Sequence, residues 1–271
     1  MPELPEVETV ARQLAPSVAG RRVRGLEILD PLLEDGRTPQ LAGRPIASVE
    51  RSGKRVLFEF GPARGRQVRP LWLAVHLRMT GRLLWLERAA AVPREHLRAR
   101  FRVDGGELLF VDTRRFGTFR WYRTREAAAP VGVEPLSPEL TRPRLASLLR
   151  GSSQEIKPWL LRQDRLVGLG NIYASEILHA AGLSPFRAAG SLDGREIRRL
   201  LVATRRILTQ AIRACGTTFS DFQDARGIEG SYQRFLAVYE REGQRCRRCR
   251  ARVERVVQQQ RSTYHCPGCQ A

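Results

Sequence analysis

The sequence predicts an α+β protein with an amino-terminal β-sandwich, flanking helices and a helical carboxyl-terminal region that ends in a zinc-finger hairpin. Three observations support this. Short alternating apolar runs fill residues 22–122, helical apolar spacing follows beyond residue 140, and four cysteines form C-x2-C-x16-C-x2-C near the end of the chain. We therefore expect sheets first, helices second and a metal-stabilised tail.

The amino-terminal region begins with a helix and continues as strands. Apolar residues at helical spacing predict one helix over residues 3–15, closed by Pro16 and Gly20. The runs RVLFEF, LWLAVHL, LLWL, ARFRV, ELLFV and TFRWY alternate or are short and apolar, as in strands. Asp104-Gly105-Gly106 is typical of a hairpin turn. These strands form a β-sandwich or a barrel, and we take the sandwich as the prediction.

The helical region follows a proline-rich stretch. Residues 127–140 contain three prolines and little periodicity, which is typical of a linker. Helical patterns then cover about 142–150, 155–163, 171–182 and 194–214. The predicted division is a sandwich domain over 1–128, a linker over 129–140, a helical domain over 141–235 and a zinc finger over 236–271.

The chain is strongly basic. Forty-seven basic and twenty-eight acidic residues give a net charge of +19, which indicates a polyanionic partner, nucleic acid first. An acidic lipid surface is the alternative, but no apolar run is long enough to span a membrane and no basic amphipathic helix dominates. The start MPELPEVETV lacks the features of a secretory signal. We expect a cytoplasmic, nucleoid-associated monomer without a small-molecule cofactor.

The cysteines indicate a metal site. In a reducing compartment, five cysteines are more readily explained as metal ligands than as a disulfide framework. Cys246, Cys249, Cys266 and Cys269 have the spacing of a structural site for one zinc ion, and four thiolates leave no open position for catalysis. His265 could compete as a ligand, but the cysteine set is complete. Cys215 lies on a helical stretch and is expected in the core.

Pro2 becomes the first residue if Met1 is removed. An α-amino group has a reference pKa of about 8, against about 10.4 for lysine, so a terminal proline nitrogen is a nucleophile near neutral pH. Its iminium with a sugar aldehyde carbon stays cationic and acts as an electron sink. Glu3 and Glu6 flank it and could donate a proton. Alternatively, Pro2 and Pro5 only start a helix whose dipole the glutamates complement.

Five further blocks decide between these alternatives. They are RSGKRVLFEF, HLRMTGRL, DTRRFG, IKPWLLRQDRLVGLGNIYASEILHAAGLSP, and a tail of LAVYEREGQRCRRC with QQQRSTYHCPGC. With MPELPEVET they occur in order and span almost the whole chain, which resembles the formamidopyrimidine-DNA glycosylases. The resemblance implies a bifunctional glycosylase and abasic-site lyase with a helix-two-turn-helix domain. Its substrate would be duplex DNA that carries an oxidised purine, and the strand would be cut by β- and δ-elimination.

The resemblance also implies roles for individual residues. Those at the reacting sugar and its phosphates are Pro2, Glu3, Lys54 and Arg261. Those that contact DNA are His76, Met79, His96, Arg114, Arg115, Phe116, Lys157 and Asn171. Among these, Met79, Arg114 and Phe116 would fill the space that a flipped base leaves. Supporting carboxylates are Glu6 and Glu176.

Several of these residues have plainer explanations. Met79 and Phe116 alone would be taken for core residues, and His76 for a hydrogen-bonded histidine of a sheet. Lys54 and Lys157 are the only lysines among forty-seven basic residues, and both fall in blocks where the family carries functional lysines. Lysine offers a compact charge and an exchangeable proton, unlike arginine. Ordinary surface lysines are the alternative.

The GLGNIYASE segment and a later loop add two weaker signals. Gly168 and Gly170 precede a helix expected to begin near Asn171, so backbone amides there could bind a phosphate. Alternatively, the glycines and Asn171 only form a turn and cap the helix. Residues 224–232 resemble a loop that closes over the flipped base; an inert surface loop is the alternative.

The sequence departs from the family pattern at two positions. Arg78 stands where glycine is usual, which puts the presentation of Met79 in doubt, and Thr113 stands where proline is frequent. A related class, endonuclease VIII, prefers oxidised pyrimidines, but the leucine in PELPE and the DTRRFG block favour the purine branch. A zinc-dependent DNA-binding protein without catalysis is the remaining alternative, which the intact Pro2, Glu3 and Lys54 disfavour.

Overall fold

The structure, a computed structural model, describes every residue except 35, 37, 64–68, 88–93, 218–229 and 271. The described residues form two compact units. Unit 1 comprises residues 1–129 and 214–231, and unit 2 comprises residues 130–213 and 232–271. The chain therefore leaves unit 1 after residue 129 and returns to it for one short segment. The four-part division predicted from the sequence stays a prediction.

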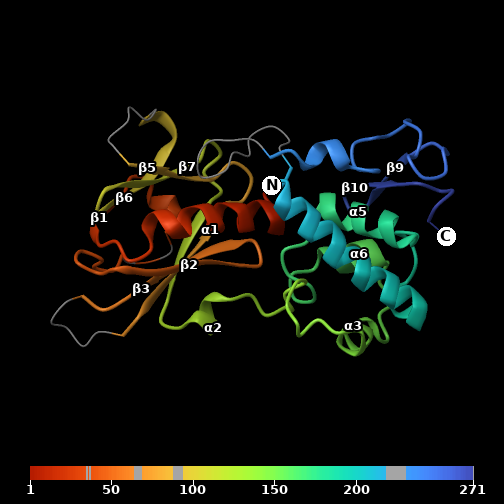
Figure 1. Cartoon of the computed structure of the whole chain (residues 1–271), viewed down its shortest axis with the longest axis horizontal. Helices are drawn as coiled ribbons and strands as arrows, with labels where there is room; N and C mark the ends of the chain where they lie inside the picture. Colours follow the sequence, from red (N-terminus) through yellow and green to blue (C-terminus); the bar gives the residue numbers. More distant parts are fainter. Residues whose placement is uncertain (35, 37, 64–68, 88–93, 218–229, 271) are drawn as a thin grey trace. The chain divides into compact units, whose positions relative to one another are not determined.

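Unit 1 contains two four-stranded antiparallel sheets (Figure 1). One sheet has the order β1-β6-β7-β5 and the other β2-β3-β4-β8. The strands are β1 (Val23–Ile28), β2 (Ile46–Ser52), β3 (Arg55–Phe60), β4 (Leu71–His76), β5 (Arg82–Leu86), β6 (Leu97–Val103), β7 (Gly106–Val111) and β8 (Thr118–Tyr122). The six quoted sequence runs lie in β3 to β8; β1 and β2 carry weaker alternation. The predicted fold class is confirmed.

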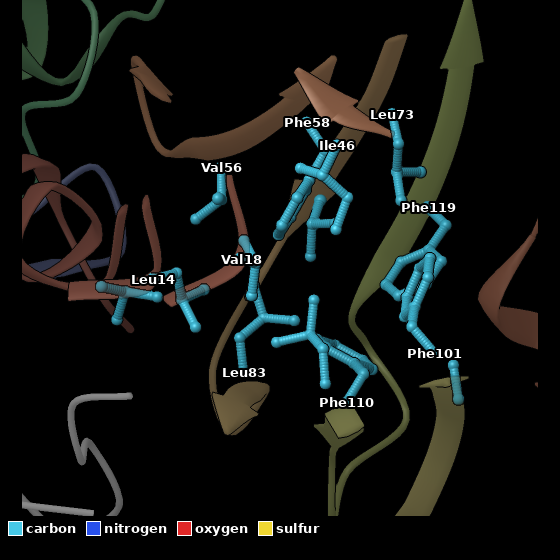
Figure 2. Packing of buried hydrophobic residues seen from close by; sticks show 14 of the residues in the cluster. Leu14, Val18, Ile46, Val56, Phe58, Leu73, Leu83, Phe101, Phe110 and Phe119 are labelled. Atoms are coloured by element: carbon cyan, nitrogen blue, oxygen red, sulfur yellow. The ribbon is translucent and has the colours of Figure 1, made fainter. Parts of the chain in front are cut away.

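The two sheets share one apolar core with helix α1 (Leu4–Val18) (Figure 2). Phe58 and Leu73 come from one sheet, Phe101 and Phe110 from the other, and Leu14 from the helix. Each is at most 1% exposed. Burial of such side chains contributes about 1.5–3 kcal/mol each, so this core fixes the sheets and the start of the chain together.

Helix α1 runs further than the sequence predicts. Pro16 lies inside the helix, which ends at Val18 rather than before the proline. Proline inside a helix costs about 3 kcal/mol, but Val18 is fully buried in the core, and its burial with that of Leu14 offsets this cost. The prediction that Pro16 closes the helix was therefore wrong.

The predicted hairpin at Asp104 is confirmed. Val103 pairs with Gly106, so Asp104 and Gly105 form a two-residue loop, and Gly105 has the positive φ of 80° that such loops require. A second two-residue loop, Gly53-Lys54, joins β2 to β3, and here the positive φ, 58°, is at the first residue, Gly53. A short helix, α2 (Arg125–Ala128), follows β8 and was not predicted.

Unit 2 is mainly helical. Its helices are α3 (Arg142–Leu149), α4 (Ile156–Leu161), α5 (Asn171–Ala181) and α6 (Gly194–Arg213), with short 3-10 turns η3 (Ala189–Ser191) and η4 (Tyr232–Phe235). All four helices fall within two residues of the predicted ranges. None of the described helices is long and apolar enough to cross a membrane.

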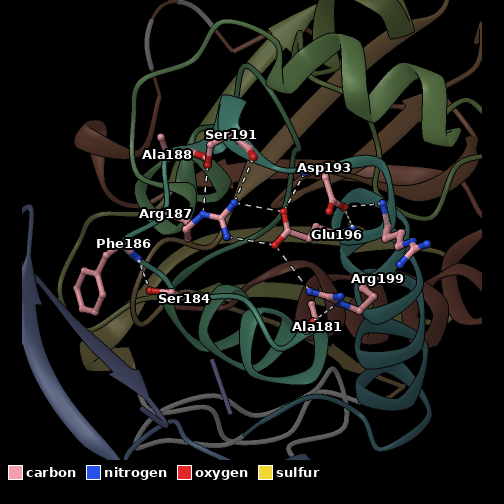
Figure 3. A network of polar contacts seen from close by, with 10 residues as sticks. Ala181, Ser184, Phe186, Arg187, Ala188, Ser191, Asp193, Glu196 and Arg199 are labelled. Atoms are coloured by element: carbon pink, nitrogen blue, oxygen red, sulfur yellow. Dashed lines mark hydrogen bonds and ion pairs between the residues drawn. The ribbon is translucent and has the colours of Figure 1, made fainter. Parts of the chain in front are cut away.

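A polar network holds the end of α5 against the start of α6 (Figure 3). Arg187 donates from two nitrogens to the carboxylate of Glu196 at 3.2 and 3.3 Å. Glu196 also accepts from the backbone N–H of Asp193, whose own side chain caps the helix. Arg199 donates to the carbonyl of Ala181 at 2.9 Å. The network fixes the angle at which the chain enters the long helix α6.

The tail forms the hairpin β9 (Glu254–Gln258) and β10 (Arg261–His265). Gln259 and Gln260 connect the strands, and both have positive φ, 46° and 61°. Two such residues make a tight turn that matches strand twist, although glycine or asparagine is the usual choice. The turn therefore stores backbone strain next to Arg261.

Candidate active site and nucleic-acid interface

The amino terminus lies on a buried carboxylate. Pro2 and Glu3 are buried directly before α1, and Glu6 is 2% exposed. One Glu6 oxygen accepts the backbone N–H of Glu3 at 2.9 Å, and the other accepts the backbone N–H of Thr217 at 2.7 Å. Gly216 has no room for a side chain, because a Cβ there would lie 2.6 Å from Glu6 Oε1. Glu6 thus fixes the position of the chain start and is engaged as an acceptor.

Lys54 lies at the tip of the hairpin between β2 and β3. It is 8% exposed, in contrast to an ordinary surface lysine. Its neighbour Arg51 donates to the carbonyl of Gly53 at 3.1 Å and to Glu8 of α1 at 2.7 Å. The same helix that begins after Pro2 therefore also holds the hairpin that carries Lys54.

His76 ends β4 close to three cations. Burial, together with Arg78, Lys54 and Arg55, lowers the pKa of His76 to about 3. Its Nδ1 accepts the backbone N–H of Arg78 at 3.0 Å, so the ring is neutral and carries its proton on Nε2. A neutral ring can donate one hydrogen bond to a phosphate but cannot contribute charge. The hydrogen bond at Nδ1 agrees with the alternative of a hydrogen-bonded sheet histidine, and it leaves Nε2 as the donor that a phosphate could contact.

Met79 projects from a tight turn. The N–H of Gly81 bonds to the carbonyl of Leu77 at 3.0 Å, and a Cβ on Gly81 would meet that carbonyl oxygen at 2.5 Å. Arg78 keeps this turn with a left-handed φ of 54°, the conformation that explains why glycine is usual there. Met79 is 43% exposed, so it is not a core residue.

The DTRRFG block forms a second exposed turn. Phe116 is 50% exposed, which excludes the core interpretation, and the Arg114 guanidinium lies 5.0 Å from the centre of its ring. Arg115 has a left-handed φ of 58° and forms a paired hydrogen bond to Asp30 at 2.7 and 2.8 Å. The Arg115 hydrogen bond, above all, holds the pKa of Asp30 below its usual value. Thr113 is exposed.

Three acceptors surround the ammonium group of Lys157. This lysine is 1% exposed and donates to Asn171 Oδ1 at 2.6 Å, Ser262 O at 3.0 Å and Thr263 Oγ1 at 2.8 Å. Asn171 also donates to Ser262 O at 2.9 Å. The structure thus brings Lys157 and Asn171 together, with both side chains tied to β10. We call these four residues the Lys157 junction.

Arg261 lies exposed at the start of β10, beside this junction. It lines a pocket of about 170 Å³ together with Lys157 and Arg162. Gln163 holds the turn before α5: its side chain accepts from the N–H of Gly168 and donates to the carbonyl of Leu169, each at 2.9 Å. Helix α5 begins at Asn171, as predicted. The pocket therefore has a basic lining suited to phosphate.

Glu176 lies buried in α5 and accepts three backbone N–H groups. The donors are Ala237, Val238 and Tyr239, at 2.8 to 2.9 Å. This carboxylate fixes the segment that leads into the zinc finger. Its role as a supporting carboxylate for the amino-terminal site stays a prediction, and the partners named here belong to unit 2.

The four cysteines form a compact cluster. Their sulfur atoms all lie within 4.8 Å of one another, as expected for ligands at about 2.3 Å around one tetrahedral zinc. Gly268 is required because a Cβ there would lie 3.0 Å from Cys249 Sγ. His179 Nε2 lies 3.4 Å from Cys246 Sγ and can orient that ligand. The cluster fits one structural zinc, with no part for His265 among the described ligand groups.

Three sequence candidates remain: His96, Cys215 and the loop over residues 224–232. His96 is partly buried in a 3-10 turn, and its Nδ1 lacks a hydrogen-bond partner among the described residues. Cys215 lies in the turn after α6 with a φ of 57° and is partly exposed, so its assignment to a helical core position was wrong. Residues 224–229 of the expected closing loop lie outside the described residues.

The geometry also identifies residues that the sequence interpretation missed. Asp112, Thr80 and Asp30 are buried and hold the two exposed turns, and Gln163 holds the turn before α5. The signal of Thr80 and Asp30 was weak because their partners Asp112 and Arg115 lie 32 and 85 residues away along the chain. The nearest signal was the position of Asp112 at the head of the DTRRFG block.

A β-sandwich with a buried amino-terminal proline and a basic helical unit with a four-cysteine hairpin define a class of zinc-finger DNA glycosylases. Three family models match the chain: the formamidopyrimidine-DNA glycosylase N-terminal domain over residues 1–119, the H2TH domain of that family over 131–223, and a zinc finger found in FPG and IleRS over 243–271. This chain belongs to the formamidopyrimidine-DNA glycosylase family.

Individual relatives agree with this assignment. Formamidopyrimidine-DNA glycosylases of Symbiobacterium thermophilum and Burkholderia cenocepacia are 43% and 42% identical, over all of this chain and 89% and 100% of theirs. The crystal structure of the MutM (FPG) protein of Thermus thermophilus is similar with a TM-score of 0.87 and 40% identity, covering 99% of this chain and 98% of that one. A Lactococcus lactis FPG variant bound to Fapy-dG containing DNA has a TM-score of 0.88 and 31% identity over 99% of both chains.

Proposed function

We propose that this protein is a base-excision repair enzyme that removes oxidised purines from duplex DNA and then cuts the strand at the abasic site. The observation that carries the proposal is the buried start of the chain, where Pro2 is buried next to Glu3, and the hydrogen bonds of Glu6 hold the Glu3 backbone. A nucleophile and an adjacent acid in a fixed geometry are what attack at a sugar carbon requires.

The reaction follows from these groups. The Pro2 nitrogen bonds to deoxyribose C1′, the bond from C1′ to the base breaks, and Glu3 supplies a proton as the sugar ring opens. The resulting iminium is cationic and accepts the electrons of the C2′–H bond as this proton passes to solvent, so the 3′ C–O bond breaks and the 3′ phosphate leaves. Loss of the C4′ proton then breaks the 5′ C–O bond and releases the 5′ phosphate. Lys54 would donate a proton or bind a phosphate at this site. Arg261 would bind the phosphates around the lesion and assist the second elimination.

We further propose that the exposed Met79, Arg114 and Phe116 replace the flipped base, since filling this space offsets lost stacking of a few kcal/mol. His76, His96 and Arg115 would contact phosphates. The basic pocket beside the Lys157 junction would take another phosphate, with Lys157 in its wall and Asn171 hydrogen-bonded to Lys157. These contacts require that DNA exchange with the observed internal hydrogen bonds of Arg115 and Lys157.

When bound, zinc would hold the two cysteine pairs together and give the hairpin β9–β10 a stable base. The zinc would be structural, because four thiolates complete the coordination. We propose that residues 1–128 form the catalytic domain, that residues 141–235 bind DNA, and that the enzyme acts as a cytoplasmic, nucleoid-associated monomer.

Borohydride trapping tests the proposal. Mass spectrometry first establishes that Met1 is absent, and the protein is then mixed with duplexes that carry 8-oxoguanine or thymine glycol in the presence of borohydride. We expect a covalent adduct and strand cuts on both sides of the lesion, with preference for 8-oxoguanine. A preference for thymine glycol would assign the chain to the pyrimidine-specific branch. No adduct with either duplex would leave a DNA-binding protein without catalysis, and an active chain that retains Met1 would exclude the Pro2 mechanism.

A further inference from the structure

A buried carboxylate joins the two exposed turns of unit 1. Asp112 follows β7 directly and is 1% exposed. Its Oδ2 accepts the backbone N–H of Gly117 at 2.7 Å, and its Oδ1 accepts that of Arg114 at 3.2 Å. The carboxylate thus bonds to the turn that presents Phe116 on both sides of that residue.

The same carboxylate reaches the other turn. Asp112 Oδ1 accepts the hydroxyl of Thr80, which follows Met79, and Thr80 Oγ1 in turn accepts the backbone N–H of Arg114 at 3.1 Å. Thr80 is 7% exposed, whereas Met79 beside it is 43% exposed. One oxygen of Asp112, the Thr80 hydroxyl and the Arg114 amide therefore form a closed set of hydrogen bonds that bridges the two turns.

The backbone leaves little freedom around this set. A Cβ on Gly117 would lie 2.4 Å from the Phe110 ring and 3.0 Å from Asp112 Oδ2, so the turn closes directly onto the carboxylate. Arg98 donates to the carbonyl of Asp112 at 2.8 Å and lies 3.8 Å from the carboxylate of Asp30, which holds Arg115. Buried hydrogen bonds therefore fix both ends of the turn that carries Arg114 and Phe116, while Phe116 at its tip is exposed.

We propose that Asp112 and Thr80 are positioning residues that lock the Met79 turn to the Arg114–Phe116 turn, so that both enter a DNA duplex as one rigid wedge. The proposal rests on the proposed function of these tips as fillers of the space left by a flipped base. Hydrogen bonds to a buried charged group are the strong ones, because an unpaired partner would be left without water. Fixing the wedge before binding lowers the entropic cost of inserting it.

Positioning by Asp112 differs in a measurable way from simple stabilisation of the fold. A wedge is needed only where a base stack must be opened and refilled. Cleavage at an abasic site in a single strand needs the amino-terminal site but no wedge. Loss of the lock should therefore separate these two activities, whereas general damage to unit 1 would lower both.

The test compares Thr80→Val, Thr80→Ser and Asp112→Asn with the unchanged protein. Thr80→Val keeps the shape of the side chain and removes the hydroxyl, Thr80→Ser keeps the hydroxyl, and Asp112→Asn removes one acceptor. A matched control is Thr204→Val, which removes a buried hydroxyl that bonds only within helix α6, to the carbonyl of Leu200 at 2.8 Å. The rates measured are single-turnover excision of 8-oxoguanine from a duplex and cleavage of a single-stranded abasic oligonucleotide.

We expect Thr80→Val and Asp112→Asn to slow duplex excision about 10-fold or more, and to change single-strand cleavage by less than roughly threefold. Thr80→Ser and Thr204→Val should retain both rates. Equal loss of both activities in Thr80→Val, or no loss in either, would overturn the proposal.

A fluorescent base distinguishes failure of this proposal from failure of the proposed function. 2-Aminopurine placed opposite a tetrahydrofuran abasic analogue brightens when the stack around it opens. At saturating protein, the unchanged chain and Thr80→Ser should give a large rise, and Thr80→Val a clearly smaller one. If the unchanged chain excises no 8-oxoguanine, the proposed substrate is wrong, and this fluorescence difference alone decides whether Thr80 positions a wedge. Identical rises in all variants would overturn the lock.

Discussion

Met79 and Phe116 are 43% and 50% exposed, whereas Lys157 is 1% exposed, although the sequence predicts DNA contacts for all three. In unit 1, buried hydrogen bonds hold the turns that carry Met79 and Phe116, while these two side chains stay exposed. In the Lys157 junction of unit 2, the side chain for which a DNA contact is predicted makes the internal hydrogen bonds itself. In unit 1, the residues that hold the structure therefore differ from those predicted to contact DNA. In the Lys157 junction, one residue is expected to do both.

This difference predicts how each region responds to mutation. Where support and contact are separate, a tip can be removed without loss of stability. Where one residue does both, every change affects folding and DNA binding together. Zinc removal and changes at Lys157, Phe116 and His76 test this contrast, from the largest expected effect to the smallest.

Zinc removal should have the largest effect and should act on unit 2 alone. Structural zinc contributes on the order of 10 kcal/mol to the folding of small zinc modules, and the apolar cluster around the finger includes only Val238 and Val253 besides cysteines among its buried members. A strong chelator should abolish DNA binding, measured by fluorescence anisotropy, while β-sheet circular dichroism remains. Full DNA affinity after measured zinc loss would refute a structural role for the metal.

Replacing Lys157 should come next. Lys157→Met removes the donor of three hydrogen bonds, one of them fully buried, and should lower the free energy of unfolding by about 2–5 kcal/mol. Urea unfolding of the zinc-loaded protein, followed by circular dichroism, measures this change. An unchanged urea midpoint would show that the ammonium does not hold the junction and would remove the contrast with unit 1.

Truncation of an exposed tip should leave stability intact. Phe116→Ala should slow excision from duplex DNA about 10-fold, because stacking on an aromatic ring is worth roughly 1–3 kcal/mol, and should change the free energy of unfolding by less than about 0.5 kcal/mol. Phe235→Ala in η4, where the ring is 62% exposed, is the matched control and should retain the excision rate. Comparable slowing in both variants would contradict a specific role for Phe116.

Acid should weaken unit 1 through His76. The folded pKa of His76 is about 3, below the value of about 6.5 in an unfolded chain, so its protonation favours unfolding. This stabilisation is complete above pH 6.5 and is lost as the pH falls from 6.5 toward 3, by at most about 1.4 kcal/mol per pH unit. His76→Gln should flatten this part of the stability curve, measured as urea midpoints at pH 7 and 5.5. Parallel curves for both proteins would exclude His76 as the source.

Much of the fold followed from local patterns. Alternation identified β3 to β8, and helical spacing with Asn171 after two glycines placed α5 at its observed start. Helix α1 was misjudged because the rule for Pro16 is local, whereas the burial that outweighs it comes from the sheets. Local rules fail where distant packing decides.

The candidate site divides in the same way. The residue types at Pro2, Glu3 and the four cysteines could be interpreted from chemistry and spacing alone. The roles of Asp112 and Asp30 could not, because their partners Thr80 and Arg115 lie 32 and 85 residues away along the chain. Lys157 was expected to face a phosphate, and its bond to Ser262 crosses 105 residues.

The hydrogen bond from Thr217 to Glu6 has a consequence for biosynthesis. Pro2 is among the first residues to leave the ribosome, yet the carboxylate beside it gains this partner only after residue 217 of 271 has been made. The hydrogen bonds around the proposed nucleophile are thus completed late, by a segment that returns to unit 1 after the helices of unit 2. Chains that terminate before Thr217 carry Pro2 without this support for Glu6.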